Sequence, residues 1–174
     1  MLPDDVMTQT DIFPIPIGTS GAFAIAARPR GGDWLTGDLE RLALDGVDIL
    51  VSLLDVDELV ELGLENEPAL CALNGLRYAR VPVPDLGTPP DTARFLDAVR
   101  DIVTDLRAGR NVAVHCGQSV GRSGLFAVSV AVALGATLER ALEDVSEARG
   151  VRVPETQGQL YWLREHVDRL SAVT

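Results

Sequence analysis

Cys116 and Arg122 are separated by five small or uncharged residues in the sequence NVAVHCGQSVGRSGLF. A cysteine thiolate is a nucleophile, and the planar guanidinium group of arginine can bind two phosphate oxygens at once. If NVAVH forms a strand and RSGLFAVSVAVALG a helix, the loop between them presents successive backbone N–H groups inward, and the helix adds the unpaired N–H donors and the positive end of its dipole. Such a loop is an anion cradle that favours the thiolate of Cys116, so we expect this sulfur to attack a bound phosphoryl group. The loop backbone that would hold the phosphoryl oxygens consists of Gly117, Gln118, Ser119, Val120 and Gly121, followed by Arg122.

Neither residue is diagnostic alone, because a cysteine after an apolar strand is usually a small core residue. The context favours catalysis: a strand, then His115 and Cys116, then two glycines, then an Arg-Ser-Gly sequence that opens an apolar helix. Gly117 and Gly121 allow the backbone turns that a tight cradle requires.

A departing oxygen needs a proton when the P–O bond breaks, and an aspartate on a mobile loop can supply it. Asp85, in VPVPDLGTPP, comes just after an expected strand and is the candidate acid. An aspartate between proline and glycine residues is also a common turn residue, so this alternative stays open. Asp91 is the competing carboxylate, but it precedes an amphipathic helix and is expected to be its N-cap.

The elements that would position these groups alternate between strands and helices in the middle of the chain, which predicts an α/β fold with a mainly parallel sheet. A ligand site should then lie at the carboxyl ends of the strands. Strands are expected at 12–17, 22–29, 47–54, 76–83 and 111–115, and helices at 37–46, 55–63, 65–75, 91–109, 122–135, 137–148 and from about 154 onward.

The length of 174 residues suits one domain over 1–174. A net charge of −11 argues against nucleic acid and anionic membrane surfaces as partners.

Two distant cysteines make neither a disulfide framework nor a zinc site, so we expect no metal. The acidic N-terminus is also unlike a secretory signal, so we expect a cytoplasmic protein. All 15 basic residues are arginine, which suggests GC-rich coding and a bacterial source.

The sequence VHCGQSVGRSG resembles the signature His-Cys-x5-Arg-Ser of the cysteine-dependent protein tyrosine phosphatases. It is most similar to the compact dual-specificity branch and to small phosphatases of the cyclin-dependent-kinase-inhibitor-associated type, from about GGDWL to the last helix. The Pro-Asp-x-Gly-x-Pro sequence around Asp85 resembles the acid loop of these enzymes. The resemblance implies a three-layer α/β fold of the protein-tyrosine-phosphatase kind, with a central, mainly parallel sheet flanked by helices.

The resemblance also implies roles for residues around the nucleophile. In the family, a hydroxyl at the position of Ser123 hydrogen-bonds the cysteine sulfur and eases its departure in the second step, and Ser123 could equally cap the helix. His115 is expected to be buried and to orient the loop by hydrogen bonds. Ser119 stands where the family usually has glycine, which is expected to change the shape or tightness of the loop.

Two further assignments from the resemblance have open alternatives. Gln159 matches the glutamine of a Thr-x-x-Gln pattern that orients the hydrolytic water, but Gln157 is only two residues away and a solvated helix residue would fit as well. Cys71 could form a disulfide with Cys116, as in some related enzymes, although the sequence ALCALNG fits a helix core better.

The sequence thus predicts a protein phosphatase that hydrolyses phosphotyrosine, with phosphoserine and phosphothreonine as further candidates, through a cysteinyl-phosphate and without a cofactor. The expected partner is a phosphorylated protein or peptide. Two alternatives remain: a phosphatase of inositol phosphates or phosphoinositides, and a catalytically weak module that binds phosphorylated residues. The first would benefit from extra cations in the loop, which CGQSVG lacks, and the second would normally have lost the cysteine or the arginine.

Overall fold

In residues 11–173, which are the residues that the computed structural model describes, the strands form one sheet in the order β1-β2-β5-β3-β4. Strands β2, β5, β3 and β4 run parallel, and β1 pairs antiparallel with β2 at one edge. In the register, Val112 of β5 lies opposite Phe23 on one side and Ile49 on the other. The strands are β1 (Ile12–Ile15), β2 (Phe23–Ala26), β3 (Ile49–Ser52), β4 (Arg77–Arg80) and β5 (Val112–His115).

The inner strands are apolar on both faces, as a sheet covered by helices on both sides requires. Along β5, Val112 and Val114 join one core cluster, and Ala113, which points the other way, joins a second. Leu50 of β3 packs with Ala113 in the second cluster. The alternation of side chains along each strand thus builds two cores from one sheet.

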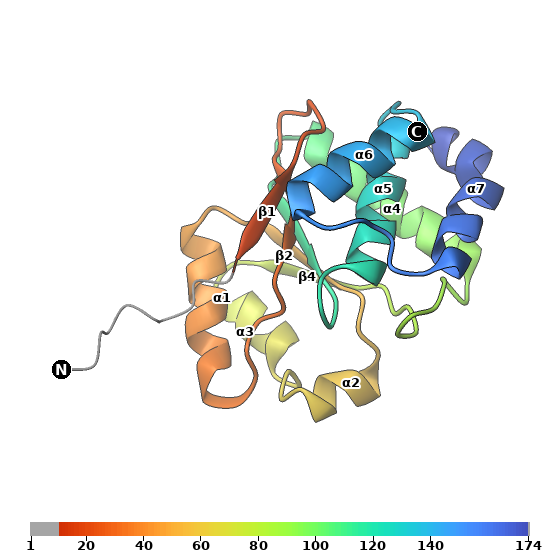
Figure 1. Cartoon of the computed structure of the whole chain (residues 1–174). Helices are drawn as coiled ribbons and strands as arrows, with labels where there is room; N and C mark the ends of the chain where they lie inside the picture. Colours follow the sequence, from red (N-terminus) through yellow and green to blue (C-terminus); the bar gives the residue numbers. More distant parts are fainter. Residues whose placement is uncertain (1–10, 174) are drawn as a thin grey trace.

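Helices cover the two faces of the sheet as separate layers, with α1, α2 and α3 on one face and α4, α5, α6 and α7 on the other (Figure 1). This is the three-layer arrangement that the resemblance implied. None of the helices in the described part of the chain has the length and apolarity that crossing a bilayer requires. The helices are the 3-10 turn η1 (Gly32–Trp34), α1 (Leu35–Leu44), α2 (Val56–Glu61), α3 (Glu67–Leu73), α4 (Thr92–Arg107), α5 (Gly121–Ala133), α6 (Leu138–Arg149) and α7 (Gln157–Ser171).

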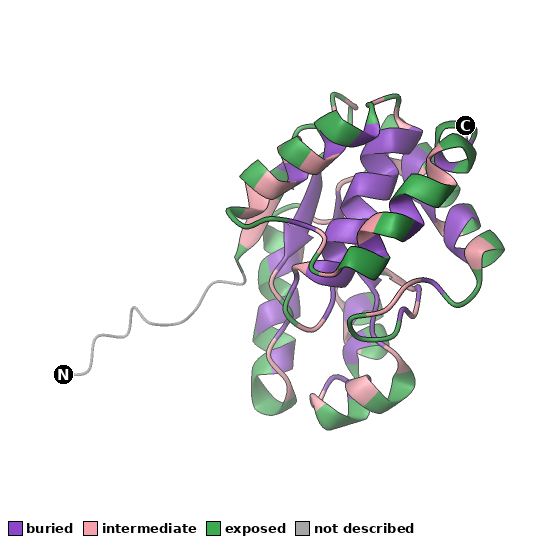
Figure 2. Ribbon diagram, turned by 45° about the vertical axis from the view of Figure 1, so that its right-hand side comes forward, coloured by how far each residue is buried: buried purple, intermediate pink, exposed green. Residues whose placement is uncertain are grey.

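Helix α5 is buried along its whole length, as Figure 2 shows. It packs against β5, α4, α6 and α7, which explains why its sequence is apolar all round rather than on one stripe. An aromatic cluster joins it to its neighbours: the ring of Phe95 meets those of Phe126 and Trp162 edge to face, at 5.6 and 5.1 Å between centroids. The loop before α5 is therefore anchored to a helix that is buried on all sides.

Element boundaries differ from the sequence prediction in a few places. Helix α7 begins at Gln157 rather than near Pro154, because the Thr156 side chain accepts a hydrogen bond from the N–H of Gln159 and forms a capping box with it. On α7 the buried residues are Gln159, Trp162, Leu163 and Leu170, whereas Leu160 is only half-buried.

Candidate active site

Segments from distant parts of the chain meet at the carboxyl edge of the sheet and line a cavity of about 390 Å³. The loop after β5 and the first turn of α5 bring Cys116 and Arg122. The start of α2 after β3 brings Glu58, and the loop after β4 brings Asp85. Parallel neighbouring strands end at the same edge, so three loops that are far apart in the sequence share one site. The structure therefore brings the predicted nucleophile, arginine and acid together.

Cys116 lies at the base of this cavity and is 2% exposed. The backbone N–H of Ser119 donates a hydrogen bond to its sulfur at 3.1 Å. A donor aimed at sulfur favours the charged thiolate over the neutral thiol. The loop thus supplies the kind of contact that a nucleophilic cysteine needs.

Arg122 is buried and is held in a fixed orientation by Glu58. Its Nη1 and Nη2 atoms donate to the two carboxylate oxygens of Glu58, both at 2.9 Å, and Nη1 also donates to the carbonyl oxygen of Val83 at 2.9 Å. Asp85 approaches Nη2 at 3.4 Å. Burial alone would lower the pKa of Arg122, but the hydrogen bonds to Glu58 and the charges of Cys116, Glu58 and Asp85 raise it above its ordinary value. Arg122 is therefore a permanent, oriented cation.

Glu58 is a site residue that the sequence analysis missed. It is the third residue of a capping box at the start of α2, where its Oε2 accepts from the N–H of Asp55 at 3.1 Å and Asp55 accepts from the N–H of Glu58 at 2.8 Å. The Asp-x-x-Glu spacing in DVDEL is a visible signal for this cap. The contact with Arg122, by contrast, depends on how β3 and β5 pair.

Asp85 stands at the mouth of the cavity, where its side chain is 70% exposed. An exposed carboxylate on a loop is free to move toward a leaving group. Asp91, the competing carboxylate, accepts a hydrogen bond from the N–H of Arg94 at the start of α4, at 3.1 Å. The capping role expected for Asp91 is thus confirmed, and of these two aspartates only Asp85 lines the cavity with Cys116.

His115 is buried behind the loop and spans two groups. Its Nε2 lies 2.6 Å from Oε1 of Glu67, and its Nδ1 lies 3.3 Å from the carbonyl oxygen of Cys116. Glu67 is fully buried in the first turn of α3 and was not predicted. The pair connects α3 to the base of the loop, which agrees with an orienting role for His115.

Ser119 and Ser123 have different environments. Ser119 adopts a positive φ of 57°, a conformation that glycine adopts freely, and its hydroxyl donates to the carbonyl oxygen of Ala26 at 2.6 Å. Ser123 is buried in the first turn of α5, and its Oγ has no hydrogen-bond partner among the residues that the structure describes. The sulfur contact expected for Ser123 is made instead by the backbone of Ser119.

Gln159 is buried between two loops, whereas Gln157 is exposed. Its Nε2 donates to the carbonyl oxygen of Gly87 in the loop that carries Asp85, at 3.1 Å. Its Oε1 lies so close to Gly121 that a Cβ there would meet it at 3.2 Å. Of the two candidate glutamines, Gln159 is the one beside both functional loops.

Cys71 lies on the other side of the sheet from Cys116. It packs in the core formed with α1 and α3, whereas Cys116 belongs to the core formed with α4 to α7. Burial, followed by the charge of Glu67, raises the pKa of Cys71 to about 12. The environment is that of a neutral core thiol.

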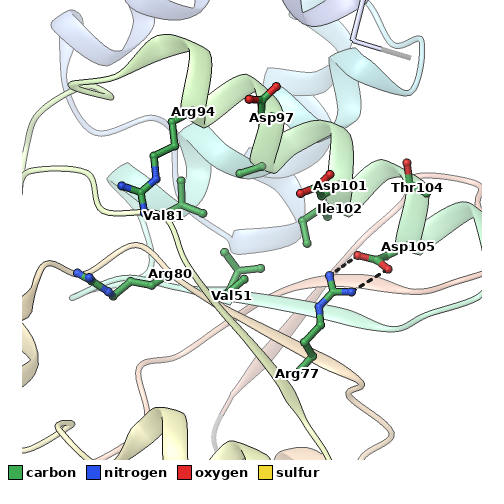
Figure 3. Close-up of a pocket in the computed structure, with 12 residues that line it drawn as sticks. Val51, Arg77, Arg80, Val81, Arg94, Asp97, Asp101, Ile102, Thr104 and Asp105 are labelled. Atoms are coloured by element: carbon green, nitrogen blue, oxygen red, sulfur yellow. Dashed lines mark hydrogen bonds and ion pairs between the residues drawn. The ribbon is translucent and has the colours of Figure 1, made fainter.

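A second cavity, of about 600 Å³, lies between β4 and α4 (Figure 3). Arg77 on β4 donates hydrogen bonds to both carboxylate oxygens of Asp105 on α4 across one end of it. Val51 on the sheet and Ile102 on α4 are buried apolar residues that line it. Its lining lacks cysteine, histidine and serine, so the phosphate chemistry belongs to the first cavity.

A mainly parallel sheet whose central strand delivers a cysteine to an arginine-containing loop is the arrangement of the cysteine-dependent phosphatases, and this chain is an enzyme of that class. The chain belongs to the family described as "Polymorphic toxin system, DSP-PTPase phosphatase", whose model matches residues 24–136. The comparison with curated proteins finds no significant match.

Solved structures share the fold over most of the chain. The kinase associated phosphatase KAP has a TM-score of 0.84 and 23% identity, covering 95% of this chain and 98% of its own. Tk-PTP in the active form has a TM-score of 0.71 and 27% identity, with 90% and 97% covered. PTPMT1 in complex with PI(5)P has a TM-score of 0.72 and 21% identity, with 86% and 92% covered. The fold class and the phosphatase activity predicted from the sequence are therefore confirmed.

Proposed function

We propose that this phosphatase hydrolyses phosphotyrosine in proteins or peptides, with Cys116 as nucleophile, Arg122 as phosphoryl ligand and Asp85 as acid and base. The observation that carries the proposal is that all three residues line one cavity, with the sulfur at its base and the carboxylate at its mouth. The whole chain would act as one phosphatase domain.

The reaction takes two steps. In the first, the sulfur of Cys116 attacks phosphorus, the P–O bond breaks, and Asp85 gives its proton to the departing oxygen. In the second, water attacks the cysteinyl-phosphate, Asp85 accepts the proton, and the thiolate leaves. The backbone N–H groups of residues 117–122 and the side chain of Arg122 stabilise the charge on the phosphoryl oxygens in both steps.

The charge of the cavity favours a peptide substrate over a polyphosphorylated one. Its lining carries the carboxylates of Glu58, Glu61, Asp85 and Glu155 against the cations Arg28 and Arg122. Glu58 is already paired with Arg122, so Glu61 and Glu155 add net negative charge near the bound phosphate. The chain as a whole has a charge of −11. An inositol ring with several phosphates, an anionic membrane or a nucleic acid would be repelled by this surface, whereas phosphotyrosine brings one phosphate on a neutral ring.

The alternative of a phosphoinositide substrate has one point in its favour, since the structure of PTPMT1 bound to PI(5)P shares the fold. At 21% identity this likeness concerns the fold alone. A module that only binds phosphorylated residues is disfavoured, because Cys116 and Arg122 are both in place beside Asp85.

The test is a substrate panel with the purified protein: a phosphotyrosine peptide, matched phosphoserine and phosphothreonine peptides, vesicles containing PI(5)P, and a soluble inositol phosphate. We expect kcat/KM to be highest for the phosphotyrosine peptide, by about 10-fold or more over the polyanionic substrates, and to be unaffected by EDTA. Cys116→Ser should bind vanadate and turn over nothing. A Glu61→Gln, Glu155→Gln double variant should reduce the difference in kcat/KM between the phosphotyrosine peptide and the polyanionic substrates.

A preference for PI(5)P or the inositol phosphate would contradict the phosphotyrosine substrate but not the cysteinyl-phosphate mechanism. Turnover by Cys116→Ser, or loss of activity with EDTA, would contradict the mechanism itself.

A further inference from the structure

The outer side of the loop after Cys116 is held by Arg149, the last residue of α6. Its Nε donates to the carbonyl oxygen of Ser119 at 2.8 Å, and its Nη2 donates to that of Gln118 at 3.4 Å. The guanidinium carbon lies 4.2 Å from the centre of the Phe13 ring on β1. Helix α6 packs beside β1 at this edge of the molecule (Figure 1), so the arginine is fixed between an aromatic ring and the loop.

These contacts determine which way the peptide groups of the loop face. In the described residues the one cis peptide bond joins Val153 and Pro154, so the bonds between residues 118, 119 and 120 are trans. In a trans peptide the C=O and N–H groups point in opposite directions. Because Arg149 binds the two carbonyl groups from outside, the N–H groups of Ser119 and Val120 face inward. The N–H of Ser119 indeed reaches the sulfur of Cys116 at 3.1 Å.

Ser119 needs this support because its backbone adopts a positive φ of 57°, which L-residues other than glycine and asparagine rarely do. Two contacts hold it there. Its hydroxyl donates to the carbonyl oxygen of Ala26 at 2.6 Å, and its own carbonyl accepts from Arg149. The loop therefore gains from side chains the shape that glycine would adopt without help.

We propose that Arg149 is a positioning residue for catalysis: through Ser119 it orients the N–H donors that stabilise the Cys116 thiolate and the transferring phosphoryl group. The proposal rests on the proposed function, since the phosphoryl group is the ligand of these donors. Arg149 touches neither substrate nor sulfur. The sequence offered no signal for it beyond a basic residue in the last turn of a helix, where arginine is common in any case.

The experiment compares Arg149→Gln and Arg149→Lys with Arg140→Gln as the matched control. Arg140 lies on the same helix and is exposed, where it pairs with Asp144. Five quantities are measured for each: kcat and KM on a phosphotyrosine peptide, the vanadate Kd, the rate of Cys116 alkylation by iodoacetamide, and Tm.

For Arg149→Gln we expect kcat to fall and the vanadate Kd to rise, each by about 10-fold or more, as for other residues that orient a reacting group. Alkylation of Cys116 should be slower than in the wild type, because its sulfur loses a well-aimed hydrogen-bond donor. The kcat and vanadate Kd of Arg149→Lys should lie between those of the wild type and Arg149→Gln, since one ammonium can reach the Ser119 carbonyl but cannot bind both carbonyl groups. Arg140→Gln should match the wild type in all five quantities.

A lower Tm with unchanged kcat, vanadate Kd and alkylation rate would show that Arg149 is only structural and overturn the proposal. If Arg149→Gln does not fold, Arg149→Lys decides in the same way. If the wild type turned over no substrate, the proposed function would fail, yet vanadate binding and alkylation would still test the loop. If the wild type is active and Arg149→Gln has the same kcat, vanadate Kd and alkylation rate, the positioning role is overturned while the proposed function stands.

Discussion

The guanidinium group of Arg122 is bound on one side before any substrate arrives. Glu58 takes one hydrogen from each of Nη1 and Nη2, and Val83 takes another from Nη1. Its Nε has no hydrogen-bond partner within residues 11–173, and Nη2 faces Asp85 at 3.4 Å. The edge formed by Nε and Nη2 is therefore left for two phosphoryl oxygens. A lysine ammonium could not bind Glu58 and two phosphoryl oxygens in this way.

Asp85→Asn should separate the acid from the other groups of the site. A general acid matters most when the leaving group is basic, and phosphotyrosine releases a phenol of pKa about 10 whereas p-nitrophenyl phosphate releases an oxygen that hardly needs a proton. The variant should lose about 10²-fold in kcat/KM on a phosphotyrosine peptide, lose less on p-nitrophenyl phosphate, and lack the alkaline limb of the pH profile.

Asp91→Asn is the control for that experiment, because Asp91 caps α4 and asparagine caps a helix nearly as well. Its kcat/KM profile should match the wild type on both substrates. Equal losses on the two substrates in Asp85→Asn, or a larger effect at Asp91, would assign the acid elsewhere.

At the scale of elements, the N-terminus of α7 is a junction between the phosphate loop and the acid loop. Gln159 donates to Gly87 on one side and lies against Gly121 on the other. The close approach requires a glycine on α5: a Cβ on Gly124 would meet the Cβ of Val153 at 2.7 Å. The segment that leads into α7 can therefore pack directly on α5 and place Gln159 between the loops.

Gln159→Ala should slow the second chemical step more than the first, if this glutamine orients the hydrolytic water. The expected result is a fall in kcat of about 10-fold with a burst of p-nitrophenol close to one equivalent, because the cysteinyl-phosphate accumulates. Pre-steady-state kinetics with p-nitrophenyl phosphate measure it. Gln157→Ala, at the exposed neighbour, should behave like the wild type. If kcat of Gln159→Ala falls without a burst, Gln159 holds the two loops in place and does not orient the hydrolytic water.

For the molecule as a whole, the sheet separates the two cysteines into different layers. The pKa of Cys71 is raised to about 12, so raising the pH from 7 to 9 leaves its thiol neutral and unreactive. Iodoacetamide should therefore label Cys116 alone in the folded protein, and both cysteines once guanidinium chloride unfolds it; mass spectrometry of the labelled peptides measures this. Peroxide should produce no Cys71–Cys116 disulfide. Recovery of that disulfide from folded protein would contradict this separation, because the two cysteines could then meet without global unfolding.

The sequence by itself determined the parts of this protein that are local in the chain. Cys116 and Arg122 lie in one short segment, Asp91 caps the helix that follows it, and the apolar run after Arg122 has the length of a buried helix. These features depend on spacing, turn residues and helical period, which act over a few residues. The α/β class followed from the same local signals repeated along the chain.

Only the tertiary structure decided which distant side chains complete the site. Arg122 meets Glu58 across 64 positions, His115 meets Glu67 across 48, and Arg149 meets Ser119 across 30. The Arg149 contact exists because α6 packs against α5 and β1. The other two contacts exist because the strand order β1-β2-β5-β3-β4 places β5 beside β3, so the segments that follow these strands converge at one edge. No period or spacing encodes that order, since it results from how the two apolar faces of the sheet are buried together.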